Sequence, residues 1–317
     1  MLHRRLGTSG LQVSALCLGT ASFGRETPER EAHRMLDVFA DAGGTFVDTA
    51  DLYQHGEAER ILGGWLAGRD RDALVVATKV FRATGPGAND GGLSRKHILS
   101  AVEASLRRLR TEYIDLYQTH VWDALAPLDE TLAALDALVT AGKVRYLGAS
   151  NHPAGQLQKA VDLARQRGSA PYVSLQPLYN LLHREVEWEL AGLCRAEGLG
   201  ILPWSPLDGG RLTGARPLTA GPHAPTDRGR ADTVLRTLGD LARDLGRSPG
   251  QVALRWLMDR PGVTAPITGP HTAEQLTDCL GALDLALGAE AEERLTEASR
   301  MPLPYPYDLL AEFRDRG

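Results

Sequence analysis

The stretch Leu74-Val75-Val76-Ala77-Thr78-Lys79 is an apolar run that ends on a lysine. Similar runs lie on either side of it along the chain, at Thr45 to Asp48 and at Tyr113 to His120. Short apolar runs without strict alternation are typical of strands buried on both faces of a parallel sheet. Tyr53 follows Asp48 within one short loop. The pattern predicts strands that carry chemically useful side chains at or near their carboxyl ends.

The same alternation of short apolar runs and amphipathic stretches continues through the chain. The runs predict strands near 16–19, 45–48, 73–79, 113–119, 143–149, 172–176, 199–203 and 263–267. The amphipathic stretches predict helices near 29–42, 57–67, 94–110, 128–141, 153–167, 184–197, 230–244 and 271–282. Because there is no break in composition, eight such units predict one α/β domain over residues 1–317, a closed (β/α)8 TIM barrel.

Three segments lie outside a minimal barrel. Gly7-Thr8-Ser9-Gly10, between two apolar residues, predicts an N-terminal β-hairpin. The segment 209–230 is rich in Gly, Pro and Thr, and it is long enough to be a lid or cofactor clamp after the seventh strand. From Leu287 the chain has one extra C-terminal helix and then a Pro-rich aromatic end. Ser94 is expected to cap the helix near 94–110, and Gly142 to follow the end of the helix near 128–141.

Composition narrows the classes of function. The 317 residues are 43 % hydrophobic and 24 % charged, with a formal net charge of −5 and no long run of like charges. This argues against nucleic acid or an anionic membrane as a partner, so a small molecule is expected. The three cysteines are too far apart for a CxxC pair and fit a reducing compartment. With no evident signal peptide or membrane-length apolar stretch, a cytoplasmic location is expected.

The four polar residues suit proton donation to a carbonyl. A phenol has a pKa near 10, and an adjacent ammonium held by a carboxylate lowers it. Tyr53, Lys79 and Asp48 match those three roles, and His120 could hydrogen-bond a substrate carbonyl. Singly, each has an ordinary interpretation: a turn cap for Asp48, a solvated lysine, loop packing for Tyr53 and a structural histidine. Only their convergence at neighbouring strand ends favours catalysis.

Longer segments of the chain resemble the aldo-keto reductase family. The resemblance rests on Gly44 to Tyr53 with Gly56, Glu59 and Gly63, and on three later segments: 113–120, 142–151 and 203–207. It implies a metal-free (β/α)8 barrel that reduces aldehydes or ketones with NADPH. It also implies that Tyr53 is the general acid, that Lys79 and Asp48 tune it, and that His120 orients the carbonyl.

The resemblance also implies a cofactor site. Gly19 and Thr20 match residues beside the nicotinamide ribose, where Asp48 also lies. Ser150, Asn151 and Gln176 match side chains that bind the carboxamide, which needs both donors and acceptors. Trp204 matches an aromatic residue that stacks on the nicotinamide, although it could be a core tryptophan. The pyrophosphate loop corresponds to Ser205, Leu207, Gly209 and Gly210, where glycines allow close backbone approach.

The last cofactor segment departs from the family pattern. After Gly269, His271 stands where relatives usually carry arginine, and Cys279 stands at the position of an asparagine, while Gln275 is retained. Histidine cannot grip a 2′-phosphate bidentately. NADP(H) is therefore expected to be preferred over NAD(H) by a smaller margin than in relatives, and use of NAD(H) is possible. Four arginines of the long loop could compensate: Arg211, Arg216, Arg228 and Arg230.

Two other functions compete with carbonyl reduction. A metal-dependent barrel hydrolase needs several ligands at strand ends, and the predicted first and sixth strands supply none. Some relatives are accessory subunits of potassium channels that hold NADP, and a similar regulatory role is the alternative. For a reductase, an apolar aromatic substrate pocket is expected. Its predicted lining is Phe23, Tyr53, His120 and Trp122, with Tyr179 as a further candidate.

Overall fold

The computed structural model describes residues 1–219 and 223–314. Its centre is one sheet of eight parallel strands in the order β10-β3-β4-β5-β6-β7-β8-β9. The strands are β3 (Cys17–Gly19), β4 (Phe46–Asp48), β5 (Val75–Val80), β6 (Ile114–Thr119), β7 (Val144–Ser150), β8 (Tyr172–Gln176), β9 (Gly200–Ile201) and β10 (Ile267–Thr268). Parallel bridges join Ile201 to Val263 and Trp204 to Ile267, and they close the sheet on itself. The predicted (β/α)8 barrel is confirmed.

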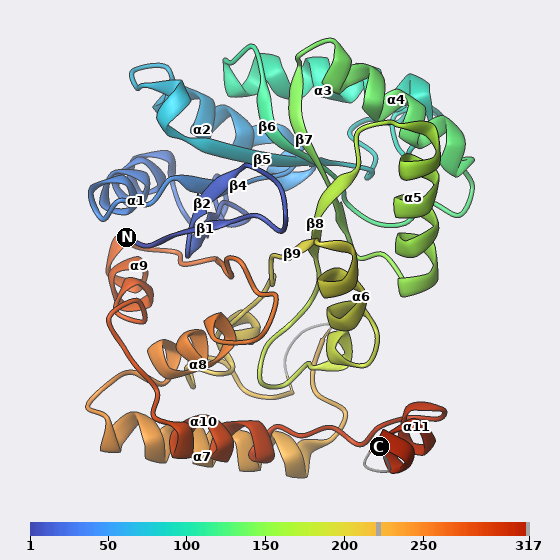
Figure 1. Cartoon of the computed structure of the whole chain (residues 1–317). Helices are drawn as coiled ribbons and strands as arrows, with labels where there is room; N and C mark the ends of the chain where they lie inside the picture. The colour runs from blue at the N-terminus through green and yellow to red at the C-terminus, as the bar shows by residue number, and fades with distance from the viewer. Residues whose placement is uncertain (220–222, 315–317) are drawn as a thin grey trace.

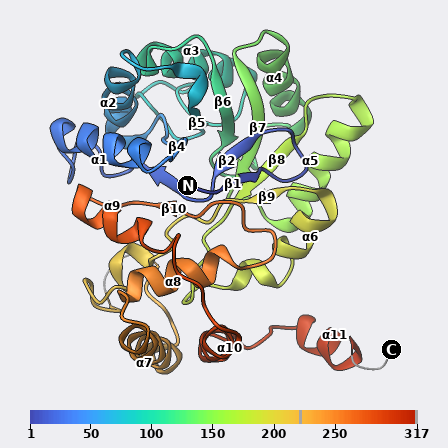
Figure 2. The same ribbon diagram turned by 60° about the vertical axis from the view of Figure 1, so that its left-hand side comes forward.

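Helices surround this sheet, as Figures 1 and 2 show. They are α1 (Glu29–Asp41), α2 (Glu57–Leu66), α3 (Arg95–Leu109), α4 (Leu128–Thr140), α5 (Ala154–Arg167), α6 (Leu190–Glu197), α7 (Arg228–Asp244), α8 (Pro249–Met258), α9 (Ala273–Leu280), α10 (Ala289–Ala298) and α11 (Tyr307–Arg314). Ser94 caps α3 as predicted, since its side chain accepts a hydrogen bond from the His97 amide. Gly142 follows α4 with a φ of 71°.

The predicted hairpin pairs β1 (His3–Arg5) with β2 (Gln12–Ser14) and covers the amino-terminal end of the barrel. The Thr8 amide donates to the carbonyl of Gly198, just before β9. A Cβ on Gly7 would lie 2.2 Å from that same carbonyl oxygen, and Gly7 has a φ of 58°. Only glycine fits this contact, which leaves the opposite end of the barrel as the place for chemistry.

The structure corrects the sequence prediction in the part of the chain that follows β8. Helix α8 was not predicted, although Ser248 caps it and Pro249 occupies its first turn. The strand expected at 263–267 is formed only at β10, and β9 is likewise shorter than predicted. Pro203 and Pro266 lie in these two segments, and proline cannot donate to a strand ladder. The helix expected at 184–197 is a 3-10 turn, Glu185–Glu187, followed by α6.

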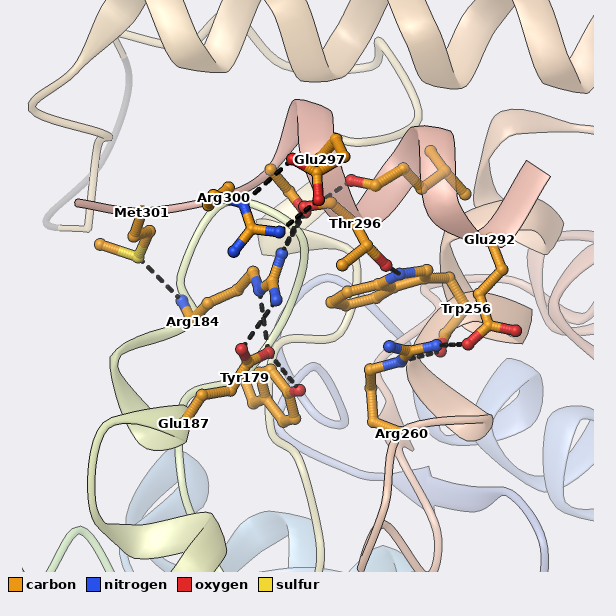
Figure 3. A network of polar contacts seen from close by, with 12 residues as sticks. Tyr179, Arg184, Glu187, Trp256, Arg260, Glu292, Thr296, Glu297, Arg300 and Met301 are labelled. Carbon is orange, nitrogen blue, oxygen red and sulfur yellow. Dashed lines mark hydrogen bonds and ion pairs between the residues drawn. The ribbon is translucent and has the colours of Figure 1, made fainter. Parts of the chain in front are cut away.

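The carboxyl-terminal extension packs against the barrel through α10, which lies beside α7 (Figure 1). Figure 3 shows the polar contacts that hold it. Arg184, after β8, donates to the Thr296 carbonyl and the Ser299 hydroxyl, both at 2.8 Å, and it pairs with Glu187. Arg260, after α8, pairs with Glu292 of α10. The extra helix from Leu287 is confirmed as α10, whereas α11 was not predicted.

The long segment after β9 begins with a 3-10 turn, Asp208–Gly210, and ends where the Asp227 side chain caps α7. Residues 220–222 of the predicted lid lie outside the described residues. Within the described ranges, the helices are too short or too polar to cross a membrane.

Candidate active site

The four residues predicted from the strand ends lie together at the carboxyl-terminal end of the barrel. Asp48 ends β4, Tyr53 opens the 3-10 turn Tyr53–Gly56, Lys79 lies in β5, and His120 follows β6. The Lys79 ammonium donates to the Asp48 carboxylate at 2.5 Å and to the Tyr53 hydroxyl at 3.3 Å. Its third bond, at 2.9 Å, is to the carbonyl of Thr49. These three bonds hold the ammonium of Lys79 in one position, and its side chain has no exposed surface.

The Asp48 carboxylate is held on both oxygens. One oxygen accepts from Lys79, and the other accepts from the amides of Gln118 at 3.1 Å and Gln176 at 3.0 Å. Gln118 was not predicted as a site residue. The sequence could have indicated Gln118, because it lies two residues before His120. Side chains two residues apart along an extended chain point to the same side. Gln176 was assigned to the carboxamide site, yet here its side-chain N–H groups already donate to the Asp48 carboxylate and to the side-chain oxygen of Gln118.

Burial and charge act in opposite directions on the lysine and the tyrosine. Burial disfavours the Lys79 ammonium and is the largest single effect, but the Asp48 carboxylate and the Tyr53 oxygen together offset it and raise the pKa of Lys79 above its ordinary value. Burial raises the pKa of Tyr53, and the Lys79 charge lowers it only in part. Lys79 thus acts on the phenol in the predicted direction, while burial determines the net shift.

His120 is a neutral imidazole in this site. Burial, followed by the positive charges of Lys79 and Arg82, lowers the pKa of His120 to about 3. Its ring meets that of Tyr53 edge-on, with centroids 6.4 Å apart. Among the described residues its Nδ1 atom has no hydrogen-bond partner. A neutral imidazole can donate one N–H to a carbonyl oxygen without adding a charge.

The residues predicted to bind the nicotinamide carboxamide form a connected strip beside this group. The indole N–H of Trp204 donates to the Asn151 side chain at 3.0 Å. The Asn151 amide donates to the Ser150 hydroxyl at 2.9 Å, which in turn donates to the Gln176 carbonyl. Asn151 has a φ of 52°, and its left-handed backbone helps to hold this geometry. The structure thus brings together four of the predicted cofactor residues.

The segment after β9 forms a turn with a largely left-handed backbone. Ser205, Asp208, Gly209 and Gly210 all have φ values between 50° and 92°. Within the turn, the Asp208 N–H donates to the Ser205 carbonyl and the Gly210 N–H donates to the Leu207 carbonyl. A Cβ built on Gly209 would lie 3.3 Å from the Arg216 guanidinium, so a cation lies beside the turn. The glycines of this turn allow close backbone approach, and the cation beside it suits an anion such as a phosphate.

Comparison with known proteins identifies the family. The Aldo/keto reductase family model matches residues 15–300. This chain belongs to the aldo/keto reductase family.

Similar proteins include reductases and channel subunits. The chain is 40 % identical to a Bacillus subtilis protein named uncharacterized oxidoreductase YrpG, over 94 % of this chain and 95 % of that one. It is 33 % identical to norsolorinic acid reductase of Aspergillus flavus, over 98 % and 84 %. It is 36 % identical to a probable voltage-gated potassium channel subunit beta of Oryza sativa, over 90 % and 92 %. Family membership and these relatives support an oxidoreductase.

Gly19 and Thr20 of this family member lie where β3 meets its neighbours. A Cβ on Gly19 would lie 2.9 Å from the Ile267 side chain, so close packing against β10 requires glycine. The Thr20 hydroxyl donates to the Asp48 carbonyl at 3.1 Å. Thr20 is fully buried in the structure and supports the strand end that carries Asp48.

The adenine-side segment differs from the prediction at one residue. His271 is exposed, and its backbone N–H donates to the Gln275 side chain at 2.8 Å. Gly269 is also exposed, with open space around the position of a Cβ. Cys279, predicted to face the cofactor, is only 6 % exposed and packs in an apolar cluster that Leu207 joins. Burial raises its pKa to about 12, so the thiol is a core group.

Two of the arginines proposed to compensate are committed elsewhere. Arg211 forms a buried ion pair with Asp208 at 2.8 Å. Arg230 donates to the backbone carbonyls of Leu182 and Ser299. Arg228 begins α7 and is exposed, while Arg216 is exposed beside the Gly209 turn. Of Arg216 and Arg228, Arg216 is therefore the one that lies beside the predicted phosphate loop.

The predicted substrate lining is only partly assembled. Phe23 has no exposed surface and belongs to the core, so its assignment to the pocket is wrong for this structure. Tyr179 is also buried, and its hydroxyl donates to Glu187 in the network of Figure 3. Trp122 is half-buried and meets the ring of His152 edge-on. Tyr53, His120 and Trp122 remain as candidate lining residues.

A metal centre was the rival predicted from other barrel enzymes. Within residues 1–219 and 223–314, histidine, cysteine and carboxylate side chains form no group of three that could hold an ion. The cysteines Cys17, Cys194 and Cys279 are all free and buried.

Proposed function

We propose that this protein reduces an aldehyde or ketone to an alcohol by hydride transfer from NADPH, with Tyr53 as the general acid. The observation that carries the proposal is the buried Lys79 ammonium, held by Asp48 and in contact with the Tyr53 hydroxyl. A cation fixed against a phenol stabilises the phenolate that remains after proton donation.

Each residue has one task in this mechanism. The neutral His120 donates its N–H to the carbonyl oxygen and orients it, while Tyr53 gives the same oxygen its proton. Lys79 stabilises the resulting phenolate, and Asp48 keeps the lysine charged although it is buried. When bound, a reduced nicotinamide would supply the hydride that adds to the carbonyl carbon. A positioned acid contributes roughly 10²–10⁴-fold to the rate.

The chain's own residues suit NADPH. Ser150 and Asn151 would hold the carboxamide, and Trp204 would contact the nicotinamide ring. The left-handed turn at Ser205 to Gly210 would bind the pyrophosphate, with Arg216 beside it. Since His271 offers no bidentate contact to a 2′-phosphate, the preference for NADPH over NADH is expected to be small, and NADH should serve as a second, weaker cofactor.

A second candidate follows from the relatives named as potassium channel subunits. A protein of that kind would bind NADPH and regulate a partner, with little turnover of its own. The intact group of Tyr53, Lys79, Asp48 and His120 favours the enzyme.

A turnover assay separates the two candidates. NADPH oxidation is followed at 340 nm with 4-nitrobenzaldehyde, an activated aldehyde, and NADPH binding is measured in parallel by fluorescence. We expect saturable turnover together with binding. Binding without turnover of this or other aromatic and aliphatic carbonyls would favour the regulatory role instead.

A further inference from the structure

A buried carboxyl group without a counter-ion lies two residues before Tyr53. Asp51 is 1 % exposed. Among the described residues, no side chain pairs with either of its carboxylate oxygens, and the backbone N–H of Leu52 is the donor that acts on them. An ionised carboxylate in such a place is costly, and buried carboxylates are therefore normally paired or neutral. Asp51 has no part in the mechanism proposed above, so its position needs a separate explanation.

The charges around Asp51 are already committed to other partners. On α2 and α3, Glu59 pairs with Arg108 at 2.6 Å, and Glu59 also accepts a hydrogen bond from Thr78. On β5, Lys79 is bound to Asp48. On β6, the Tyr117 hydroxyl is buried and lacks a partner among the described residues. With Glu59 balanced by Arg108, an ionised Asp51 would leave one uncompensated negative charge, whereas a protonated Asp51 leaves the pocket neutral.

Asp51 is also coupled to the turn that presents Tyr53. Its backbone N–H donates to the carbonyl of Lys79 at 3.4 Å. Beyond Tyr53, Gln54 and His55 have φ values of 48° and 55°, which non-glycine residues rarely adopt. The next residue, Gly56, lies so close to Arg108 that an added Cβ would be 2.6 Å from that side chain. The turn thus has a strained backbone and packs against Arg108. The charges of the Glu59–Arg108 ion pair also act on Asp51.

We propose that Asp51 is a positioning residue which, as a neutral carboxylic acid, holds the 51–56 turn so that Tyr53 stays in contact with Lys79. A neutral carboxyl can donate one hydrogen bond inside the pocket, which an ionised carboxylate cannot do. Its ionisation would place a negative charge opposite Glu59 and push the turn away from the Glu59–Arg108 pair. The kinetic part of this inference rests on the proposed reduction, while the ionisation of Asp51 does not.

The pH at which Asp51 loses its proton is the quantity that the experiments can detect. Burial, and then the charge of Glu59, raise the pKa of Asp51 to about 7, against the opposing effects of Arg108, the Leu52 backbone N–H and Lys79. The unfolded value is about 3.9, so the folded state holds the proton over a higher pH range than the unfolded state. The stabilising contribution of Asp51 is complete below about pH 4 and is lost as the pH rises to about 7.

The kinetic test compares the wild-type protein with Asp51→Asn, which keeps the shape of the neutral acid. The ratio of kcat/KM, variant over wild type, cancels any ionisation common to both, including that of Tyr53. With a pKa of about 7, the protonated fraction falls about tenfold between pH 6 and pH 8, so the ratio should rise by about the same factor. Asp115→Asn is the matched control, because that buried carboxylate pairs with Arg71 outside the site, and its ratio should stay flat.

The stability test needs no turnover. The melting temperature of Asp51→Asn minus that of the wild-type protein should increase from pH 5 to pH 7 and then level off. If the amide disrupts folding, Asp51→Ser supplies a smaller neutral side chain for the same comparison. A flat difference in melting temperature shows that Asp51 does not titrate and overturns the proposal. A rising difference with a flat kinetic ratio shows titration without positioning and overturns it equally.

Failure of the wild-type protein to reduce any carbonyl refutes the proposed function and the positioning role with it, while the melting curves still report the ionisation of Asp51.

Discussion

The two ends of the predicted binding site are built differently. At the catalytic end, Asp48, Lys79 and Tyr53 are joined by short contacts within a buried network. At the adenine end, His271 is exposed and Cys279 lies in the core. Buried charges have no solvent to replace a lost partner, so each residue of the first end requires the others. An exposed contact contributes affinity by itself, and its loss leaves the fold unchanged.

The largest effect is expected from the phenol. In Tyr53→Phe the ring stays and the hydroxyl is lost, so turnover should fall by roughly 10²–10⁴-fold, the contribution of a positioned acid. NADPH affinity should hardly change. Steady-state kinetics and fluorescence titration measure the two quantities. Tyr113→Phe is the control, since that hydroxyl bonds Asp72 away from the site, and turnover like the wild type in Tyr53→Phe itself would remove Tyr53 from the mechanism.

The next effect concerns the buried cation. Lys79→Met leaves Asp48 buried without its ion-pair partner, so the free energy of unfolding should fall by about 3–5 kcal/mol. Activity should be lost, and the residual activity should show its acidic group at higher pH, because Lys79 lowers the pKa of Tyr53. Urea unfolding and the pH–rate profile measure these changes.

Lys143→Met is the matched control for that experiment, because Lys143 pairs with Glu103 on the outer surface. It should leave both quantities nearly unchanged. A different role for Lys79 would be a Schiff base with the carbonyl, as in aldolases on this fold. We expect no covalent adduct by mass spectrometry after borohydride treatment with substrate, and an adduct would exclude the proton-donor mechanism.

The smallest effect tests the adenine end. His271→Arg should tighten NADPH by roughly ten- to a hundredfold, the value of a charge-assisted phosphate contact of about 1.5–3 kcal/mol. NADH, which lacks the 2′-phosphate, should bind almost as before.

Dissociation constants for both cofactors, measured by fluorescence quenching in the wild-type protein and in His271→Arg, decide this point. His3→Arg adds the same charge on the hairpin at the opposite end of the barrel and should change neither constant. If NADPH affinity is also unchanged in His271→Arg, then His271 does not face the 2′-phosphate, and the proposed position of the adenosine is wrong.

The residues that sequence could locate share one property. Asp48 and Lys79 lie within or at the end of apolar strands, and His120 directly follows one, so the prediction of the strands was sufficient to place them. In a parallel barrel all strand ends open on one face, and convergence follows from topology. Local patterns were enough for Ser94, Gly142 and the hairpin as well, because caps and tight turns depend on neighbouring residues.

The remaining features depend on contacts between segments far apart in the chain. Gln118 supports Asp48 only because β6 lies beside β5, which in turn lies beside β4. Phe23 and Cys279 looked like site residues by position, and tertiary packing buried them. Asp51 reads as an ordinary loop carboxylate until α2, α3 and β6 enclose it. The sequence alone determined the barrel and the strand ends that carry the chemistry, because both follow from local periodicity. Burial, and with it the charge state of each polar group, was decided by tertiary structure, because desolvation depends on everything that packs around a residue.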